Sequence, residues 1–221
     1  MSFKGFPVEA FGFYEGLLAD NSKAYWQANK HVYEAAVKAP MQALSDAVKD
    51  EFGELHLFRP HRDVRFAKDK SPYKTNAGAV TEGEGGEIYY LGLSPDGLMM
   101  GAGYYAMALD QLERHRAALD DEVTGSNVAG IVAGLERAGY SIGAIDSLKT
   151  APRGYPKDHP RIELLRRKGL IATCSFQPAA WMSTKGALSR ITDVWRGCAD
   201  LIGWLNGQVG PSNLPPEEFG R

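Results

Sequence analysis

Apolar residues recur every three or four positions at both ends of the chain, a pattern that predicts amphipathic helices. The helices expected from this spacing cover residues 7–20, 22–52, 107–121, 126–138, 159–168 and 185–206. Pro7 suits the first turn of the first helix, and Pro40 should break or kink the second near residue 39. Asp158 can cap the helix at 159–168, with Pro160 in its first turn.

The middle of the chain has short extended runs separated by Gly and Pro, which predict β-strands. Runs at 88–93 and 98–105 flank Ser-Pro-Asp-Gly at 94–97, a turn sequence that predicts a β-hairpin. Further antiparallel strands are expected at Arg65–Phe66, at 77–81 and at 170–177. Helices, then strands, then helices predict an α+β fold: an antiparallel sheet with a central β-hairpin, flanked by N-terminal and C-terminal helices.

Composition supports an ordinary globular protein and excludes disorder, collagen and coiled coil, since 44% of the 221 residues are hydrophobic and 24% are charged. We expect a single domain over 1–221, with a short Pro-rich tail from about residue 208. No apolar run has membrane-spanning length and the start lacks a signal-peptide pattern, so we expect a cytoplasmic protein without a membrane partner. Cys174 and Cys198 belong to no CxxC or Cys/His cluster, which predicts reduced core thiols and no metal site.

The formal net charge of −2 conceals two strongly basic stretches. Residues 59–74 hold six basic and two acidic side chains, and residues 149–168 hold seven and two. Local basic stretches in an acidic protein favour a site for a small anion if the two meet in space, since a nucleic-acid surface usually makes the whole domain basic. The alternative is two solvated faces whose charges pair with the acidic remainder.

Familiar catalytic and cofactor motifs are missing or out of context. Gly-Ala-Gly-Tyr-Tyr-Ala at 101–106 matches a dinucleotide-binding pattern, but it follows a predicted hairpin strand and opens no helix, so we assign its glycines to strand packing or close backbone approach. His-Arg-Asp at 61–63 resembles a kinase catalytic loop, yet Lys68 stands where that loop needs Asn. No nucleophile-elbow, zinc-protease or P-loop motif occurs, and no cofactor can be named.

The first basic stretch concentrates groups that bind anions or transfer protons. The candidate ligand-binding residues there are Arg62, Arg65, Lys70 and Lys74. The candidate acids and bases are Asp63, Asp69 and Tyr73. Pro72 and the short polar side chains of Asp69 and Ser71 should stiffen the turn. The same residues also fit a structural alternative, an Arg/Asp salt-bridge network that locks the loop against the helices.

Several motifs together carry a family resemblance. They are the run R-x-x-R-D-x-R-F-x-K-D-K-x-P-Y-K-T from Arg59 to Thr75, the Gly/Tyr-rich hairpin, Pro-Arg-Gly-Tyr at 152–155 and Asp-His-Pro at 158–160. On these residues the chain resembles, over almost its whole length, the conserved hypothetical family called domain of unknown function 2461. The resemblance implies a single α+β domain without an established reaction. It also implies candidate site residues in the second basic stretch, namely Arg153, Tyr155 and His159.

The second basic stretch fits the same chemistry. Arg153 and Tyr155 lie in a Gly/Pro-rich loop and are candidate ligand-binding residues. His159 is the candidate acid or base, placed where the free amides of a predicted short helix could help hold an anion. The alternative for His159 is a surface histidine without chemistry.

Three functions remain open on these residues. The first is an enzyme or binding protein for a small anionic metabolite, including phosphorylated ones, and it requires both basic stretches to converge on one concave pocket. The second is an interaction module that binds RNA or an acidic protein partner through a flat basic surface, helped by exposed Tyr89, Tyr104 or Tyr155. The third is a purely structural motif. Reaction type, ligand, metal dependence and oligomeric state are not determined by the sequence.

Overall fold

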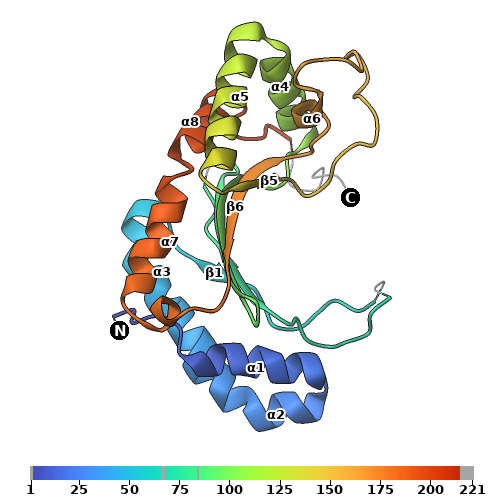
Figure 1. Cartoon of the computed structure of the whole chain (residues 1–221). Helices are drawn as coiled ribbons and strands as arrows, with labels where there is room; N and C mark the ends of the chain where they lie inside the picture. Colours follow the sequence, from blue (N-terminus) through green and yellow to red (C-terminus); the bar gives the residue numbers. More distant parts are fainter. Residues whose placement is uncertain (1, 66–67, 84, 215–221) are drawn as a thin grey trace. The chain divides into compact units, whose positions relative to one another are not determined.

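The structure is a computed structural model that describes residues 2–65, 68–83 and 85–214. Helices at both ends of the chain accompany a six-stranded antiparallel sheet with the strand order β1-β2-β3-β4-β6-β5 (Figure 1). The predicted α+β fold class is therefore confirmed.

The strands are short, and the predicted hairpin lies at the centre of the sheet. Their bounds are β1 His56–Leu57, β2 Ala77–Val80, β3 Ile88–Ser94, β4 Gly97–Tyr104, β5 Ser141–Gly143 and β6 Leu170–Phe176. β3 and β4 form the hairpin, turning at Pro95 and Asp96. The strand expected at Arg65–Phe66 is not seen at Arg65, which lies in a bend, and Phe66 lies outside the described residues. β1 and β5 were not predicted, because two or three residues carry no detectable alternation.

The N-terminal helices match the predicted pattern, except near Pro40. Their bounds are α1 Val8–Ala19, α2 Lys23–Val32 and α3 Ala39–Phe52. A π-helical segment, Tyr33–Lys38, joins α2 to α3, so the irregularity expected near residue 39 takes the form of a π-helical segment that precedes Pro40, and the backbone stays helical. Pro40 falls in the first turn of α3, where its missing N–H costs little.

The later helices differ in length from the expected ones: α5 is longer than the expected helix at 126–138, and the others are shorter. Their bounds are α4 Leu109–Asp120, α5 Glu122–Arg137, α6 Ile162–Leu165, α7 Gly186–Arg196 and α8 Ala199–Gln208, with a 3₁₀ turn at Ala180–Ser183. The expected helix at 185–206 is two helices separated at Gly197, where a Cβ would lie 2.2 Å from the Tyr140 hydroxyl. The expected helix at 159–168 is the single turn α6, which has no side-chain cap, so Asp158 does not cap it.

Contacts divide the chain into two compact units. The first unit comprises the chain up to Thr81, Tyr90–Met100 and Ser175–Asp193. The second unit comprises Glu82–Tyr89, Gly101–Cys174 and the chain from Val194 on. The expectation of a single domain stays a prediction.

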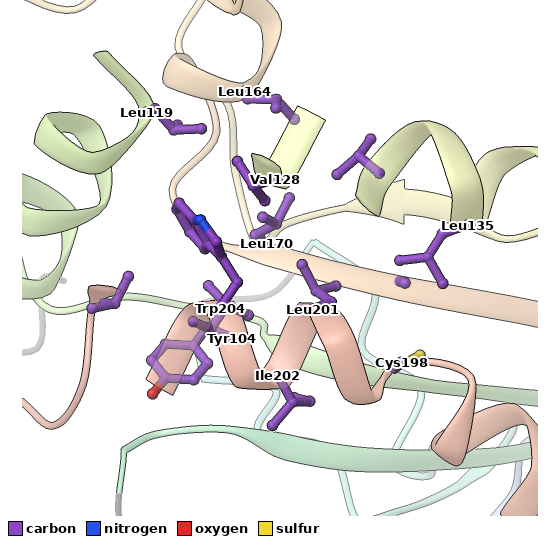
Figure 2. Close-up of a cluster of buried hydrophobic side chains, with 14 of the residues drawn as sticks. Tyr104, Leu119, Val128, Leu135, Leu164, Leu170, Cys198, Leu201, Ile202 and Trp204 are labelled. Atoms are coloured by element: carbon purple, nitrogen blue, oxygen red, sulfur yellow. The ribbon is translucent and has the colours of Figure 1, made fainter. Parts of the chain in front are cut away.

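The core of the second unit is a set of buried side chains from β4, β6, α4, α5 and α8 (Figure 2). Trp204 of α8 packs in this cluster and donates its indole N–H to the Thr124 carbonyl at 3.0 Å. Cys174 and Cys198 are buried free thiols, and burial raises the pKa of Cys198 to about 12. The prediction of core thiols is therefore confirmed. None of the helices among the described residues is long and apolar enough to cross a membrane.

Gly101 and Gly103 confirm the assignment of the Gly-Ala-Gly motif to the sheet. Both lie within β4, and a Cβ at Gly101 would lie 2.4 Å from the Ala172 carbonyl oxygen of β6. A Cβ at Gly103, which has a φ of +147°, would lie 2.3 Å from the Leu170 carbonyl oxygen. These glycines allow β4 and β6 to approach closely, and no phosphate-binding helix follows them.

Candidate functional site

The basic loop, residues 59–75, connects β1 to β2 in the first unit. Its two arms pair through an isolated antiparallel bridge, with His61 opposite Tyr73. The Lys74 amide donates to the Pro60 carbonyl at 2.8 Å, and the Arg62 amide donates to the Pro72 carbonyl at 2.9 Å. Because side chains alternate along an extended arm, His61 and Tyr73 face one way while Arg62 and Lys74 face the other.

Aromatic stacking fixes the base of the basic loop to the N-terminal helices. The Tyr73 ring stacks on Trp26 of α2, with centroids 4.4 Å apart and planes 8° apart, and His61 packs beside both rings. The Asn21 side chain bonds both backbone groups of Tyr73, donating to its carbonyl at 3.0 Å and accepting from its amide at 3.1 Å. Tyr73 is only 4% exposed. This position supports an anchoring role for a residue that the sequence suggested as a proton-transfer candidate.

Most charges in the distal part of the loop are paired with each other. Arg65 binds Asp63 through two N–H groups, from Nε to Oδ1 at 3.0 Å and from Nη2 to Oδ2 at 2.6 Å. Arg62 forms an ion pair with Asp69. The Lys70 ammonium donates to the Val64 carbonyl oxygen at 2.9 Å. These contacts hold the loop's own turns, and none of them joins the loop to a helix.

The two loop carboxylates are poorly placed for proton transfer. The Arg65 side chain holds the pKa of Asp63 below its ordinary value, chiefly by hydrogen bonding. Hydrogen bonds from the Ser71 hydroxyl and amide, at 2.6 and 2.9 Å, hold the pKa of Asp69 below its ordinary value. Both carboxylates are therefore ionised at neutral pH and already accept hydrogen bonds, which makes them weak bases.

Lys74 differs from the other loop cations. Its side chain is half-buried, and its ammonium lies 5.1 Å from the centroid of the Phe58 ring. Burial lowers the pKa of Lys74, and the positive charge of nearby Arg59 lowers it further. Within the described residues, neither Lys74 nor Arg59 forms an ion pair with a carboxylate. The positive charges of Lys74 and Arg59 therefore repel each other, although Arg59 also acts on the Asp63 carboxylate, whose pKa it lowers. A bound anion would relieve the repulsion between the two cations.

An aromatic surface lies beside these cations. The Phe58 amide donates to the Gly78 carbonyl at 2.8 Å, which extends the pairing of β1 with β2 by one residue. The register pairs Gly78 with Gly92 and Val80 with Tyr90, so Phe58, Gly78, Tyr90 and Gly92 share one face of the sheet. A Cβ at Gly78 would lie 3.0 Å from the Phe58 ring and 3.4 Å from the Tyr90 ring. Glycine therefore lets both rings lie against the backbone of β2.

A hollow of about 310 Å³ adjoins Tyr90 on the first unit. That volume is at the lower end of small-molecule sites. Its lining residues come from the ends of β3 and β4, the start of β2 and the end of α1: Leu18, Thr75, Asn76, Tyr90, Gly92, Leu93, Ser94, Pro95, Asp96 and Met99. The hollow therefore combines apolar side chains with hydroxyl, amide and carboxylate groups that can bond a ligand.

His159 is buried in the second unit, where its ring makes one hydrogen bond and one close contact with a carboxylate. Its Nδ1 accepts from the Arg161 amide at 3.0 Å, and its Nε2 lies 3.3 Å from Oδ1 of Asp120. The alternative of a surface histidine is wrong, since only 8% of the residue is exposed. The expected helix start at His159 is also wrong, because Pro160 lies in a turn and α6 begins only at Ile162. Neither ring nitrogen is available to a ligand in this arrangement.

The other candidates in the second unit differ in their exposure. Arg153 is exposed, and in the part of the chain that the structure covers it makes no ion pair. Tyr155 packs against the core of the second unit, and burial raises the pKa of its hydroxyl. Tyr104, expected as an exposed stacking residue, is fully buried and donates to Asn206 at 2.9 Å, which corrects that expectation. Tyr89 is half-buried and packs on Trp195.

The candidate residues of the first basic stretch lie together in one loop, and their position relative to the candidates of the second stretch is untested. Candidates from Arg62 to Lys74 share one loop of the first unit, whereas Arg153, Tyr155 and His159 belong to the second unit. Convergence of the two basic stretches therefore stays a prediction. The described residues contain no group of three or more His, Cys, Asp or Glu side chains suited to a metal ion.

Phe58 and Arg59 were not among the candidate site residues, although Arg59 opens the family motif and belongs to the first basic stretch. Phe58 lies two residues after His56 on the same side of the extended chain, but Gly78, which makes room for its ring, lies on another strand. The contact that distinguishes Phe58 is tertiary.

The fold and the loop define an α+β protein whose antiparallel sheet carries a cation-rich connection between its first two strands. The chain belongs to the conserved hypothetical protein family DUF2461, whose family model matches residues 9–204. The resemblance seen in the sequence motifs is therefore confirmed. No curated protein and no solved structure matches the chain.

Proposed function

We propose that this protein binds a small anion, such as a phosphorylated metabolite, through Lys74 and Arg59 of the basic loop. The observation that carries the proposal is the pair of neighbouring cations without a carboxylate partner in the described residues. The loop's own acids, Asp63 and Asp69, are occupied by other side chains. An anion would therefore meet two neighbouring positive charges that form no close ion pair within the described residues.

The chemistry and the fixed backbone of Lys74 suit the binding of an anion. An arginine can grip phosphate or carboxylate with two N–H groups, and a lysine adds a point charge. The paired arms of the loop and the Tyr73 anchor hold the backbone of Lys74 in place, so little ordering is needed when a ligand binds. Partial burial also weakens the screening of the Lys74 charge.

This proposal changes which cations are assigned to the anion site. Lys74 remains a candidate ligand-binding residue, and Arg59 is added. Arg62 and Arg65 are less suited because each already binds an aspartate, and Lys70 donates to a backbone carbonyl. The proposal concerns binding alone and assigns no reaction.

The test is titration calorimetry with inorganic phosphate and pyrophosphate at about 50 mM salt, where a two-cation site is weakly screened. Lys74→Gln and Arg59→Gln should each weaken binding about tenfold or more, which corresponds to about 1.4 kcal/mol. Arg65→Gln is the matched control, because it removes a cation from the same loop whose charge is already paired. Loss of binding in Arg65→Gln but not in Lys74→Gln would place the site in the distal part of the loop and contradict the proposal.

The RNA alternative is separated from this proposal by its salt dependence. A surface that contacts many phosphates loses affinity steeply with salt, whereas a two-cation site has a shallow slope. Titration of a short single-stranded RNA at about 50 and 200 mM salt measures that slope. Tight RNA binding with a steep slope, together with no binding of phosphate or pyrophosphate, would favour the interaction module.

A further inference from the structure

The Tyr90 side chain lies along the sheet, whereas strand side chains usually stand roughly perpendicular to it. A Cβ at Gly92 would lie 2.6 Å from the Tyr90 hydroxyl and 3.1 Å from its ring. On the neighbouring strand β2, a Cβ at Gly78 would lie 3.4 Å from the same ring. Tyr90 is half-buried, and its ring lies against the positions of both glycines. This is the geometry of a stacking platform for a flat ligand.

The platform is continuous with the proposed anion site. Phe58 and Tyr90 both contact the position of Gly78, and the Lys74 ammonium lies over the Phe58 ring at 5.1 Å. Phe58 extends β1 and Tyr90 lies on β3, two strand spacings away, which is about 10 Å. One molecule with an anionic end and a flat end joined by a sugar-sized spacer could therefore contact the cations and Tyr90 together.

The hollow next to Tyr90 supplies polar groups for the edge of a flat ring. Asn76 offers both an amide donor and a carbonyl acceptor, and the Asp96 carboxylate accepts hydrogen bonds. Met99, which is 44% exposed, adds a flexible apolar contact. The negative charge of Asp96 disfavours an anionic group at this end, so the hollow suits the neutral ring and the Lys74 end suits the anion.

We propose that the ligand is a mononucleotide, or another phosphorylated compound with a flat heterocyclic ring, whose phosphate meets Lys74 and Arg59 while its ring stacks on Tyr90 beside the hollow. The inference rests on the proposed function for its anionic half. Its own carrying observation is the Tyr90 ring lying over Gly78 and Gly92 next to a polar hollow. Base stacking on an aromatic side chain increases affinity by roughly tenfold to a hundredfold.

The experiment compares four ribonucleoside 5′-monophosphates with ribose 5-phosphate, which has the same phosphate and sugar but no base. We expect at least one mononucleotide to bind the wild-type protein about tenfold more tightly than ribose 5-phosphate. Tyr90→Leu should reduce that mononucleotide to the affinity of ribose 5-phosphate and leave ribose 5-phosphate unchanged. Tyr90→Phe should retain the preference, because it keeps the ring, and thermal unfolding of each variant checks the fold.

Tyr105→Leu is the matched control, since Tyr105 is a tyrosine 46% exposed in the second unit. It should bind the mononucleotide as the wild type does. Equal affinities for ribose 5-phosphate and all four mononucleotides would overturn this inference while leaving the anion site intact. Absence of binding by inorganic phosphate, ribose 5-phosphate and the mononucleotides alike would overturn the proposed function as well.

Discussion

Acid should destabilise this protein through one histidine, His115 of α4. The residue is fully buried, and neither ring nitrogen has a hydrogen-bond partner within the described residues. Its ring packs edge-on against Trp204, with centroids 5.8 Å apart. Burial lowers the pKa of His115 to about 3, and the charge of Arg116 acts in the same direction.

The sign and size of the effect follow from proton linkage. In the unfolded chain a histidine has a pKa of about 6.5, so the unfolded state takes up a proton before the folded state does. The contribution of His115 to stability is fully present above pH 6.5 and is lost as the pH falls from 6.5 toward 3. At about 1.4 kcal/mol for each unit, the loss at pH 4.5 is about 3 kcal/mol, a large part of the stability of an ordinary domain.

Urea unfolding, followed by tryptophan fluorescence at pH 7.0 and pH 4.5, measures this loss. His115→Leu removes the titrating group at similar volume, so its stability should fall by about 3 kcal/mol less than that of the wild type between the two pH values. His31→Gln, a change of an exposed histidine on α2, is the control and should behave as the wild type does. An equal pH dependence in His115→Leu and the wild type would refute the reasoning.

Three further predictions concern stability and reactivity. Arg161→Met should lower the free energy of unfolding, measured in urea, by about 2–3 kcal/mol, because the buried guanidinium donates to carbonyls between α4 and α5. Glu122→Gln changes an exposed partner of Arg161 and should have little effect. Gly103→Ala should lower the free energy of unfolding by more than about 2 kcal/mol, because the new Cβ would meet the backbone of β6. Gly12→Ala, in open space on α1, should be neutral or raise the stability by up to about 1 kcal/mol. Thermal unfolding of the two variants measures the difference. Cys198 should resist a disulfide reagent until the protein unfolds, since it is buried and its pKa is about 12; prompt labelling of the native protein would contradict this.

Local signals in the sequence determined most of the elements. The central hairpin followed from a four-residue turn with Pro and Gly at fixed positions, since that turn needs no distant contact. Helix existence followed from apolar spacing, but helix ends did not. Gly197 divides the last helix because Tyr140, far away in sequence, occupies the space of a side chain. The single turn α6 likewise follows from the turns before it, which apolar spacing does not show.

For the candidate site too, the sequence determined one part and the tertiary structure the other. Charge counting located the basic loop, because six cations within sixteen residues are visible in any conformation. Only the tertiary structure decided which charges form close ion pairs: the turns of the loop bring Arg62 to Asp69 and Arg65 to Asp63, and place Lys74 beside Phe58. The stacking surface also needed the fold, since strand register is what places Gly78 and Gly92 beneath rings from β3 and the end of β1. Residue type and order along the chain are properties of the sequence, whereas pairing and burial depend on contacts between segments that only folding brings together.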